Sequence, residues 1–504
     1  MKKINSVLIS VFDKQGLDVI ARAFQKNDIK IYSTGGTYTY LESLNIDSVK
    51  VEDVTDYPSI FDGRVKTLHP KIFGGILANR TVEGHKKDIE TYNIPLIDMV
   101  VVDLYPFEDT IKITKNKDEI IEKIDIGGIS LIRAAAKNFH DVLVVSSKNQ
   151  YDEVLSYLEE HNYNTDCEMR MFYAKEAFHI SSEYDSCIFN WFDNNQYSRL
   201  KVSISKSQYL RYGENPHQTA NFFGNLDDVF TKLSGKDLSY NNLLDCDSAI
   251  NLINDFDEPT IAIIKHTNAC GVASRPNLVD AWNLALSSDP VSAFGSVIIC
   301  NNVVTNELAN KINKLFFEVL IAPSFSEEAL ATLEQKKNRI LLKLNNISFP
   351  KHQIRTILNG VLFQERDSHI DSEIDFNYVT DLKPKEESVS DLLFAAKIVK
   401  HSKSNAIVLA KNNQMISSGI GQTSRVDALN QAIEKAKFFK LDLKDAVMAS
   451  DAFFPFPDCV EIAAKNGIST IIQPGGSIRD NESIEACNKN NIAMVFTDKR
   501  HFKH

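Results

Sequence analysis

The chain has 504 residues, of which 43% are hydrophobic and 24% are charged, and this length predicts a globular protein of two or three domains. Its net charge of −11 disfavours broad nucleic-acid and anionic-membrane binding, while local basic pockets for small phosphates stay open. Because it has no membrane-length apolar stretch, no signal-like N-terminus and no C-x-x-C pair among seven cysteines, we expect a cytoplasmic protein without a membrane span, a disulfide framework or a zinc ribbon.

The first third alternates short apolar runs with amphipathic segments. Residues Lys14–Lys26 carry a helical apolar spacing at Leu17, Ile20, Ala21 and Phe24. Such alternation predicts an α/β layer around a parallel sheet, followed by one long helix over Glu168–Trp191. The predicted strands are Ser6–Val11, Ile29–Tyr32, Met99–Leu104 and Val142–Ser146.

The polar segment Asp193-Asn194-Asn195-Gln196 predicts a domain junction near residues 195–200. Beyond it the sequence suggests an internal duplication. An apolar run enters a polar loop at Ile261–Gly271 and again at Ser404–Lys411, and Val291–Cys300 and Ala446–Phe456 lie in comparable downstream places. The charged segment Asp381–Glu387 is a candidate hinge between the two halves.

Four motifs in the first third suit an anionic ligand. Ser33-Thr34-Gly35-Gly36-Thr37 follows a strand and opens a helix, where backbone N–H groups and hydroxyls can converge on a phosphate. Taken alone, the same motif could equally be a turn with a helix cap. The second motif, Asp62–Pro70, contains Arg64, Lys66 and Thr67, although composition alone favours a solvated basic loop there. The other two motifs are Asp103–Phe107 at a strand end and Ile124–Gly128 with Arg133–Asn138.

In order and spacing, these motifs resemble the inosine monophosphate cyclohydrolase domain, which has a methylglyoxal-synthase-like fold. The resemblance rests on SVFDKQGL, STGGT, GRVKTLHP, DLYPF and DIGG followed by LIRAAAKN, and it runs through residues 1–197. It implies ring closure of a formamido-imidazole carboxamide ribotide with loss of water, without a metal. The implied nucleotide-binding residues are Ser10, Lys14, Ser33, Thr34, Gly35, Gly36, Thr37, Arg64 and Thr67, and the implied catalytic residues are Lys66, Tyr105, Asp125 and Lys137.

Those residue types fit the chemistry, because both reacting groups sit on one molecule and orientation supplies much of the rate. Lys137 and Tyr105 could polarise the formyl oxygen, and Asp125 could accept or orient a proton. The proton route itself cannot be chosen from these residues.

Lys265-His266 ends a strongly apolar strand, Thr260–Ile264, and a cation beside an imidazole at a strand end could perform acid–base chemistry. Without further context, a surface lysine beside a hydrogen-bonded histidine explains the same residues. The surrounding strings RYGENPHQ, LSYNNLLD, DPVSAFG, KSNA, GIGQTSR, SDAFFPFPD and QPGGS supply that context.

In this order the strings resemble the aminoimidazole carboxamide ribonucleotide transformylase domain, with two cytidine-deaminase-like α/β subdomains. The resemblance covers residues 198–504, with subdomains of about 198–382 and 383–504, and implies 10-formyltetrahydrofolate as co-substrate and a homodimer. Lys265 and His266 would then be the catalytic pair, and Asn405 would orient His266 or the transferring formyl group. The nucleotide would be held by Arg211, Tyr212, Asn242, Phe294, Gly295, Arg425 and Arg500, and the folate by Phe453, Phe456 and Asp458.

The chain departs from this family at two positions. Family members usually have Pro where this chain has Ala269, and some have Arg where it has Pro457. Ala269 puts the placement of the His266 loop in doubt. The zinc-ligand pattern of deaminases is absent, so no catalytic zinc is expected. Some relatives hold a monovalent cation near the segment that matches Val399–Ser404, and the sequence leaves that open here.

Two alternatives to the two-step enzyme stay open. A chain with this sequence could retain only one of the two activities. It could also be a nucleotide-sensing protein, since methylglyoxal-synthase-like domains sense ligands elsewhere, and Lys265 and His266 would then be idle.

Overall fold

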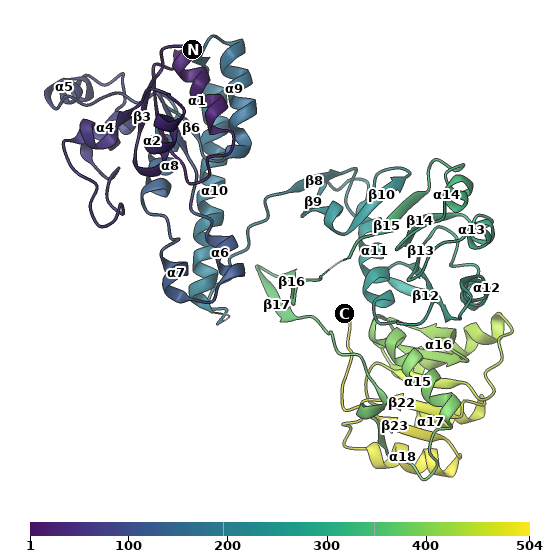
Figure 1. Ribbon diagram of the computed structural model, residues 1–504. Coiled ribbons are helices and arrows are strands. Elements are labelled where there is room, and N and C mark those ends of the chain that lie inside the picture. Colours follow the sequence, from purple (N-terminus) through teal and green to yellow (C-terminus); the bar gives the residue numbers. More distant parts are fainter. Residues whose placement is uncertain (195, 347) are drawn as a thin grey trace. The chain divides into compact units, whose positions relative to one another are not determined.

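The computed structural model describes residues 1–194, 196–346 and 348–504 (Figure 1). The chain divides into two compact units, Met1–Ser203 and Ile204–His504, which we describe separately. Asn195, part of the predicted junction, lies outside the described residues. Among the helices described, none has the length and apolarity that a membrane crossing needs.

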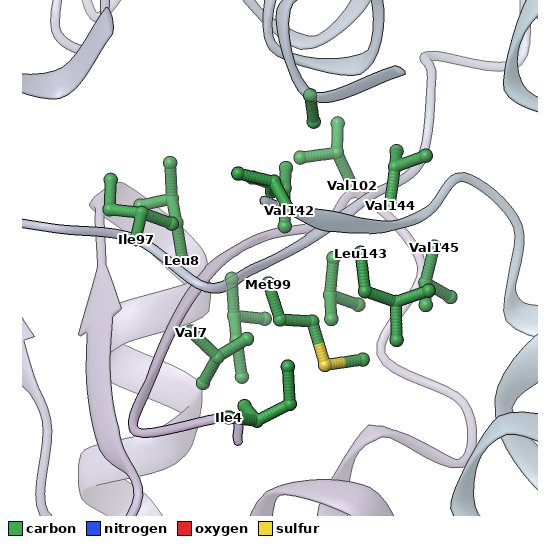
Figure 2. Close-up of a cluster of buried hydrophobic side chains, with 14 of the residues drawn as sticks. Ile4, Val7, Leu8, Ile97, Met99, Val102, Val142, Leu143, Val144 and Val145 are labelled. Atoms are coloured by element: carbon green, nitrogen blue, oxygen red, sulfur yellow. The ribbon is translucent and has the colours of Figure 1, made fainter. Parts of the chain in front are cut away.

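The first unit is built on a parallel sheet of five strands in the order β4-β3-β2-β5-β6. The expected parallel sheet is thereby confirmed, and all four predicted strands belong to it. Figure 2 shows the core where β2 and β5 pack with β6, with Val7, Met99 and Leu143 among the buried side chains. The strands are β2 (Ser6–Ser10), β3 (Lys30–Ser33), β4 (Val49–Lys50), β5 (Met99–Val102) and β6 (Leu143–Val145), and β1 (Lys2–Lys3) pairs separately with β7 (Asn164–Thr165).

Several helices of this unit pack on that sheet, among them Leu17–Lys26, Gly127–Lys137 and Cys167–Asp193. The predicted first helix begins three residues late, at Leu17, and its predicted apolar face is buried. The long helix α10 is confirmed. The helices are α1 (Leu17–Lys26), α2 (Gly35–Ser43), α3 (Val51–Thr55), α4 (Pro70–Leu77), α5 (Glu83–Thr91), α6 (Phe107–Ile113), α7 (Lys117–Ile121), α8 (Gly127–Lys137), α9 (Tyr151–Glu160) and α10 (Cys167–Asp193).

The second unit contains one sheet of twelve strands made of two halves with the same succession of elements. The first half comprises β10 (Phe230–Ser234), α11 (Tyr240–Ile253), β11 (Thr260–Lys265), β12 (Asn268–Ser274), α12 (Leu278–Ser288), β13 (Ser296–Cys300), α13 (Asn306–Ile312), β14 (Phe317–Ala322), α14 (Glu327–Leu333) and β15 (Ile340–Leu344). The second half comprises β18 (Asn377–Tyr378), α15 (Glu386–Lys400), β19 (Ile407–Lys411), β20 (Gln414–Gly419), α16 (Arg425–Phe438), β21 (Val447–Ser450), α17 (Asp458–Lys465), β22 (Thr470–Gln473), α18 (Asp480–Lys489) and β23 (Ala493–Phe496).

The internal duplication is therefore confirmed, with β11 matching β19 and β13 matching β21. In each half an antiparallel hairpin is followed by three strands that run parallel to one another. The halves join where β12 pairs antiparallel with β20, at Ala273 and Gln414. The candidate hinge Asp381–Glu387 is misplaced, because it lies between β18 and α15, inside the second half.

Alternating strand side chains divide the core of this unit between the two faces of the sheet. One cluster collects Ala262 and Ile264 with residues of α11 and α15 from both halves. Ile261 and Ile263 point into a separate cluster with α12, α13 and α14. The second half has its own equivalent cluster with α16, α17 and α18. Two small hairpins lie outside the large sheet, β8 (Ser207–Leu210) with β9 (Ala220–Phe223) and β16 (His352–Ile357) with β17 (Gly360–Glu365).

Candidate active sites

The glycine turn of the first unit joins β3 to α2. Gly35 has a φ of +51°, a left-handed backbone conformation that residues with a Cβ atom adopt less readily than glycine. The hydroxyls of the turn are engaged in the fold, because Ser33 donates to the carbonyl of Ile9 at 2.9 Å and Thr37 donates to that of Val11 at 2.9 Å. Both side chains thus fasten the turn to the end of β2. The first backbone N–H groups of α2 have no partner within the helix and are the groups suited to an anion.

Two cations lie beside this turn. The Nζ atom of Lys66 lies 3.2 Å from where a Cβ on Gly35 would stand, so a side chain there would crowd the ammonium. Burial lowers the pKa of Lys14, and the positive charge of Lys66 lowers it further, while Asp103 raises it. Thr67 completes the group, with its hydroxyl 3.3 Å from the Cβ position of Gly127. Arg64 is exposed and forms an ion pair with Glu122.

Asp125 and Tyr105 lie in the same cluster. The Asp125 carboxylate accepts the N–H of Gly128 at 2.6 Å, which caps the start of α8. Burial raises the pKa of Asp125, against the opposing pull of its backbone hydrogen bonds and of the Lys66 charge. Burial also raises the pKa of Tyr105, and the Asp125 charge adds to that rise. A phenol, a carboxyl and an ammonium therefore share one electrostatic environment at the carboxyl ends of β2, β3 and β5, the edge where ligands of open α/β sheets bind.

Lys137 does not join this cluster within one chain. It is the last residue of α8, whereas Asp125 precedes the first, so the length of the helix separates them by about 15 Å. Lys137 instead lines a cavity of about 660 Å³ with Phe73, Phe139 and Phe178. Of the other predicted residues, Thr34 is the N-cap of α2, Gly36 is the second residue of that helix, and Ser10 ends β2 beside Val102 of β5.

In the second unit, Lys265 and His266 lie at the tip of the β11–β12 hairpin. The register pairs Lys265 with Asn268 and leaves His266 and Thr267 as a two-residue turn with φ values of 51° and 63°. Both residues have the left-handed backbone of a type I′ hairpin turn. The Lys265 ammonium donates to the carbonyls of Phe294 at 2.9 Å and Gly295 at 3.0 Å.

Asn268 links this turn to the segment that carries Asn405. Its amide donates to the His266 carbonyl at 2.8 Å, and its Oδ1 accepts the N–H of Lys403 at 2.9 Å. Asn405 donates from Nδ2 to the carbonyl of Gln422 at 2.9 Å. Strand pairing then brings Ile407, which begins β19, beside Ser450, which ends β21. The Lys265–His266 turn and the carboxyl ends of β21, β22 and β23 consequently share one edge of the sheet.

Arg425, one of the residues expected to hold the nucleotide, is paired with an acidic side chain inside the protein. Its guanidinium pairs with the buried Asp451 at 2.9 Å and also donates to Ser450 at 3.1 Å. Arg425 and the exposed Arg500 lie against the ring of Phe502, at 5.7 Å and 4.3 Å from its centroid. Arg500 is therefore the freer of the two to meet a ligand phosphate.

The C-terminal segment that carries Arg500 is held by a charged cluster. His501 bonds Asp367 at 2.6 Å and lies 3.4 Å from Asp371. Burial opposes the imidazolium, but these two carboxylates outweigh it and raise the pKa of His501 to about 9. His369, Asp371 and Asp375 bring their ligand atoms close enough to surround a metal, and within residues 1–194, 196–346 and 348–504 no other group does so.

The other predicted residues lie around the same unit. Phe453 and Phe456 follow β21, and the guanidinium of Arg479 lies 4.7 Å from the Phe456 ring. Asp458 begins α17 and accepts the N–H of Cys459 at 2.8 Å. The Asn242 side chain forms a capping box with Ser239 at the start of α11, so its oxygen is already engaged. Arg211 and Tyr212 stack on each other at 4.7 Å, beyond the end of β8.

Two residues of this site, Asn268 and Asp245, received no role from the sequence. Asn268 follows Lys265–His266 by two residues and Asp245 ends the string LSYNNLLD, but the sequence does not show their partners. The N–H of Thr267 donates to the Asp245 carboxylate at 2.6 Å, a contact between residues 22 positions apart. Residues other than glycine adopt a left-handed turn only when nearby groups hold the turn by hydrogen bonds. The absence of glycine from the His266–Thr267 turn is therefore the signal that could have pointed to Asp245 and Asn268.

Comparisons with known proteins cover the whole chain. A family model described as "AICARFT/IMPCHase bienzyme" matches residues 135–435, and one described as "MGS-like domain" matches residues 16–130. The bifunctional purine biosynthesis protein PurH of Bacteroides thetaiotaomicron is 56% identical over 503 residues, which is 100% of this chain and 99% of its own. Its namesakes from Caldicellulosiruptor saccharolyticus and Aquifex aeolicus are 46% and 45% identical, each over 99% of both chains. The crystal structure of ForH matches 38% of this chain and 98% of its own, at 30% identity and a TM-score of 0.35.

Proposed function

This chain belongs to the AICARFT/IMPCHase bienzyme family, and we propose that its two compact units divide the two reactions of that bienzyme between them. The protein is a bifunctional enzyme of purine biosynthesis, which formylates AICAR with a folate co-substrate and cyclises the product to IMP. The first unit also has the expected methylglyoxal-synthase-like fold. We assign cyclisation to residues 1–197 and formyl transfer to residues 198–504, and we place the boundary between its two halves before β18, ahead of the 382/383 boundary that the resemblance implies.

The observation that carries this division is that each unit has its own set of candidate reacting groups, the cations beside the Gly35 turn in the first and the Lys265–His266 turn in the second. In the first unit, Lys66 and Lys14 lie beside the Gly35 turn, with Asp125 and Tyr105 adjoining. We assign the turn and Lys14 to the ribose phosphate. Asp125 accepts or relays the proton of the carboxamide nitrogen as that nitrogen attacks the formyl carbon. Lys66 and Tyr105 stabilise the charge on the formyl oxygen, which then leaves as water.

In the second unit we assign the Lys265–His266 turn to formyl transfer from 10-formyltetrahydrofolate. The amine of AICAR is a poor nucleophile, so His266 accepts its proton as the nitrogen attacks the formyl carbon. Lys265, held by the Phe294 and Gly295 carbonyls, stabilises the developing oxyanion and protonates the folate nitrogen that leaves. Asn405 orients the pair, Arg500 with Arg211 meets the phosphate, and Phe453, Phe456 and Asp458 line the folate side.

We further propose that the enzyme is a cytoplasmic homodimer. The position of Lys137 supports the proposal of a dimer, because about 15 Å of helix separates Lys137 from Asp125 in its own chain. If Lys137 acts in cyclisation, it acts on the site of another copy. No step of either proposed reaction requires a metal.

An end-point assay tests the proposed division. Purified protein given AICAR and 10-formyltetrahydrofolate should convert the nucleotide to IMP, measured by separating the products chromatographically. Accumulation of formylated AICAR would show that the first unit is inactive. Unchanged AICAR, with IMP made only from supplied formyl-AICAR, would show that the second unit is inactive. If neither reaction occurs although the protein still binds nucleotide, the result would instead favour a nucleotide-sensing protein.

A further inference from the structure

The hairpin that carries His266 has a counterpart in the second half. β11 and β12 pair Lys265 with Asn268, and β19 and β20 pair Lys411 with Gln414. Both hairpins have one register shift, and both end in a two-residue turn with left-handed backbone. In the second half the turn is Asn412-Asn413, a residue type that adopts this backbone readily. In the first half it is His266-Thr267, and a β-branched threonine adopts it with difficulty.

One helical carboxylate braces each turn from the same place. Asp245 is the sixth residue of α11, and Asp391 is the sixth residue of α15. Asp245 accepts the N–H of Thr267 at 2.6 Å. Asp391 accepts the N–H of Asn412 at 2.8 Å and that of Asn413 at 2.5 Å. Each half of the duplicated fold thus has a helical aspartate that accepts hydrogen bonds from the hairpin turn. Only in the first half does that turn carry candidate catalytic residues.

The two copies differ in what surrounds the carboxylate. Burial raises the pKa of Asp245, and the Thr267 hydrogen bond together with the charges of His266 and Lys265 pulls it back down. Asp245 therefore lies within electrostatic reach of both members of the proposed catalytic pair. In the second half, the corresponding lysine, Lys411, pairs with Asp442 on another segment at 3.0 Å.

We propose that Asp245 is a positioning residue of the formyl-transfer site, whose carboxylate holds the strained His266–Thr267 turn and thereby fixes the imidazole against the reacting amine. The inference rests on the catalytic role proposed above for His266. Asp391 performs the same mechanical task for a turn without catalytic groups. Asp391 therefore serves as an internal control, because replacing it shows how much of any loss comes only from destabilising a turn.

Asp245→Ala should lower kcat for formylation roughly 10²-fold, the loss expected for a displaced catalytic group, while KM for AICAR changes less than about twofold. Cyclisation of supplied formyl-AICAR should stay unchanged. Asp245→Asn keeps an oxygen that can accept the Thr267 N–H, and it should recover kcat to within about tenfold of the unmodified enzyme. Asp391→Ala should lower the melting temperature about as much as Asp245→Ala does, yet leave formylation kcat within about twofold.

The outcomes separate this inference from the proposed function. If Asp391→Ala slows formylation as much as Asp245→Ala, or if Asp245→Ala changes only KM, then Asp245 merely stabilises the fold and the inference is wrong. If Asp245→Ala does not fold, Asp245→Asn decides, because lower kcat at unchanged KM supports positioning and full loss of binding contradicts it. His266→Ala is measured beside them. If His266→Ala still formylates AICAR, the proposed role of His266 is wrong. If His266→Ala loses formylation while Asp245→Ala stays fully active, only the positioning role of Asp245 is wrong.

Discussion

Replacing His266 with alanine is expected to abolish formyl transfer and leave cyclisation intact. His266 lies at the tip of the β11–β12 hairpin, next to the Lys265 ammonium that Phe294 and Gly295 hold in place. A general base within a formed site typically contributes 10²–10⁴-fold, so kcat for formylation should fall by about that factor. The measurement is the rate of tetrahydrofolate release with AICAR as acceptor, beside the rate of IMP formation from supplied formyl-AICAR.

The duplicated hairpin supplies the control for this variant. Asn412 occupies the place of His266 in the second half and has a similar φ of 53°. Asn412→Ala therefore makes a comparable change to a comparable turn, and formylation should persist. If His266→Ala folds and loses both activities equally, the two reactions do not have separate sites.

The converse change is Lys66→Ala in the first unit, which is expected to abolish cyclisation and spare formylation. The Lys66 ammonium lies against the Gly35 turn, and its charge acts on both Asp125 and Lys14. Removing one charged group that stabilises a developing oxyanion typically costs 10²–10³-fold in rate. Cyclisation should thus lose kcat by about that factor, as measured by absorbance during conversion of formyl-AICAR to IMP.

Lys26 is the matched control, because it is an exposed lysine in the last turn of α1. Lys26→Ala removes the same charge from the same unit, and cyclisation should be unaffected. Cyclisation at the normal rate in Lys66→Ala would remove that residue from the site and leave the glycine turn without its nearest cation.

The hydrophobic periodicity of the sequence and the order of its motifs predicted much of this fold. The apolar alternation located four strands of the first sheet, because buried parallel strands read as continuous apolar runs. The weak likeness of Ile261–Gly271 to Ser404–Lys411 indicated a duplication, which the matching hairpins confirm. The sequence placed the hinge too late, since a charged run such as Asp381–Glu387 marks any solvated connection and does not distinguish one between halves from one inside a half.

Side-chain direction could not be predicted in the same way. Ser33 and Thr37 were expected to hold phosphate, but their hydroxyls donate hydrogen bonds to the carbonyls of Ile9 and Val11 at the end of β2. Arg425 was expected to hold the nucleotide, and the buried Asp451, which follows β21, pairs with its guanidinium. Lys137 and Asp125 lie close in sequence, yet an intervening helix separates them. Each of these outcomes depends on a tertiary partner or on the length of an element, which a motif does not encode.

The separation of the two reactions into two units can be tested most directly by mixing the two inactive variants. His266→Ala and Lys66→Ala, each incubated alone with AICAR and 10-formyltetrahydrofolate, should yield no IMP. Lys66→Ala should instead accumulate formyl-AICAR, which His266→Ala can cyclise. An equimolar mixture should therefore produce IMP, detected chromatographically at the end point. A mixture that stays without IMP, although both proteins are folded and bind nucleotide, would contradict two independent sites.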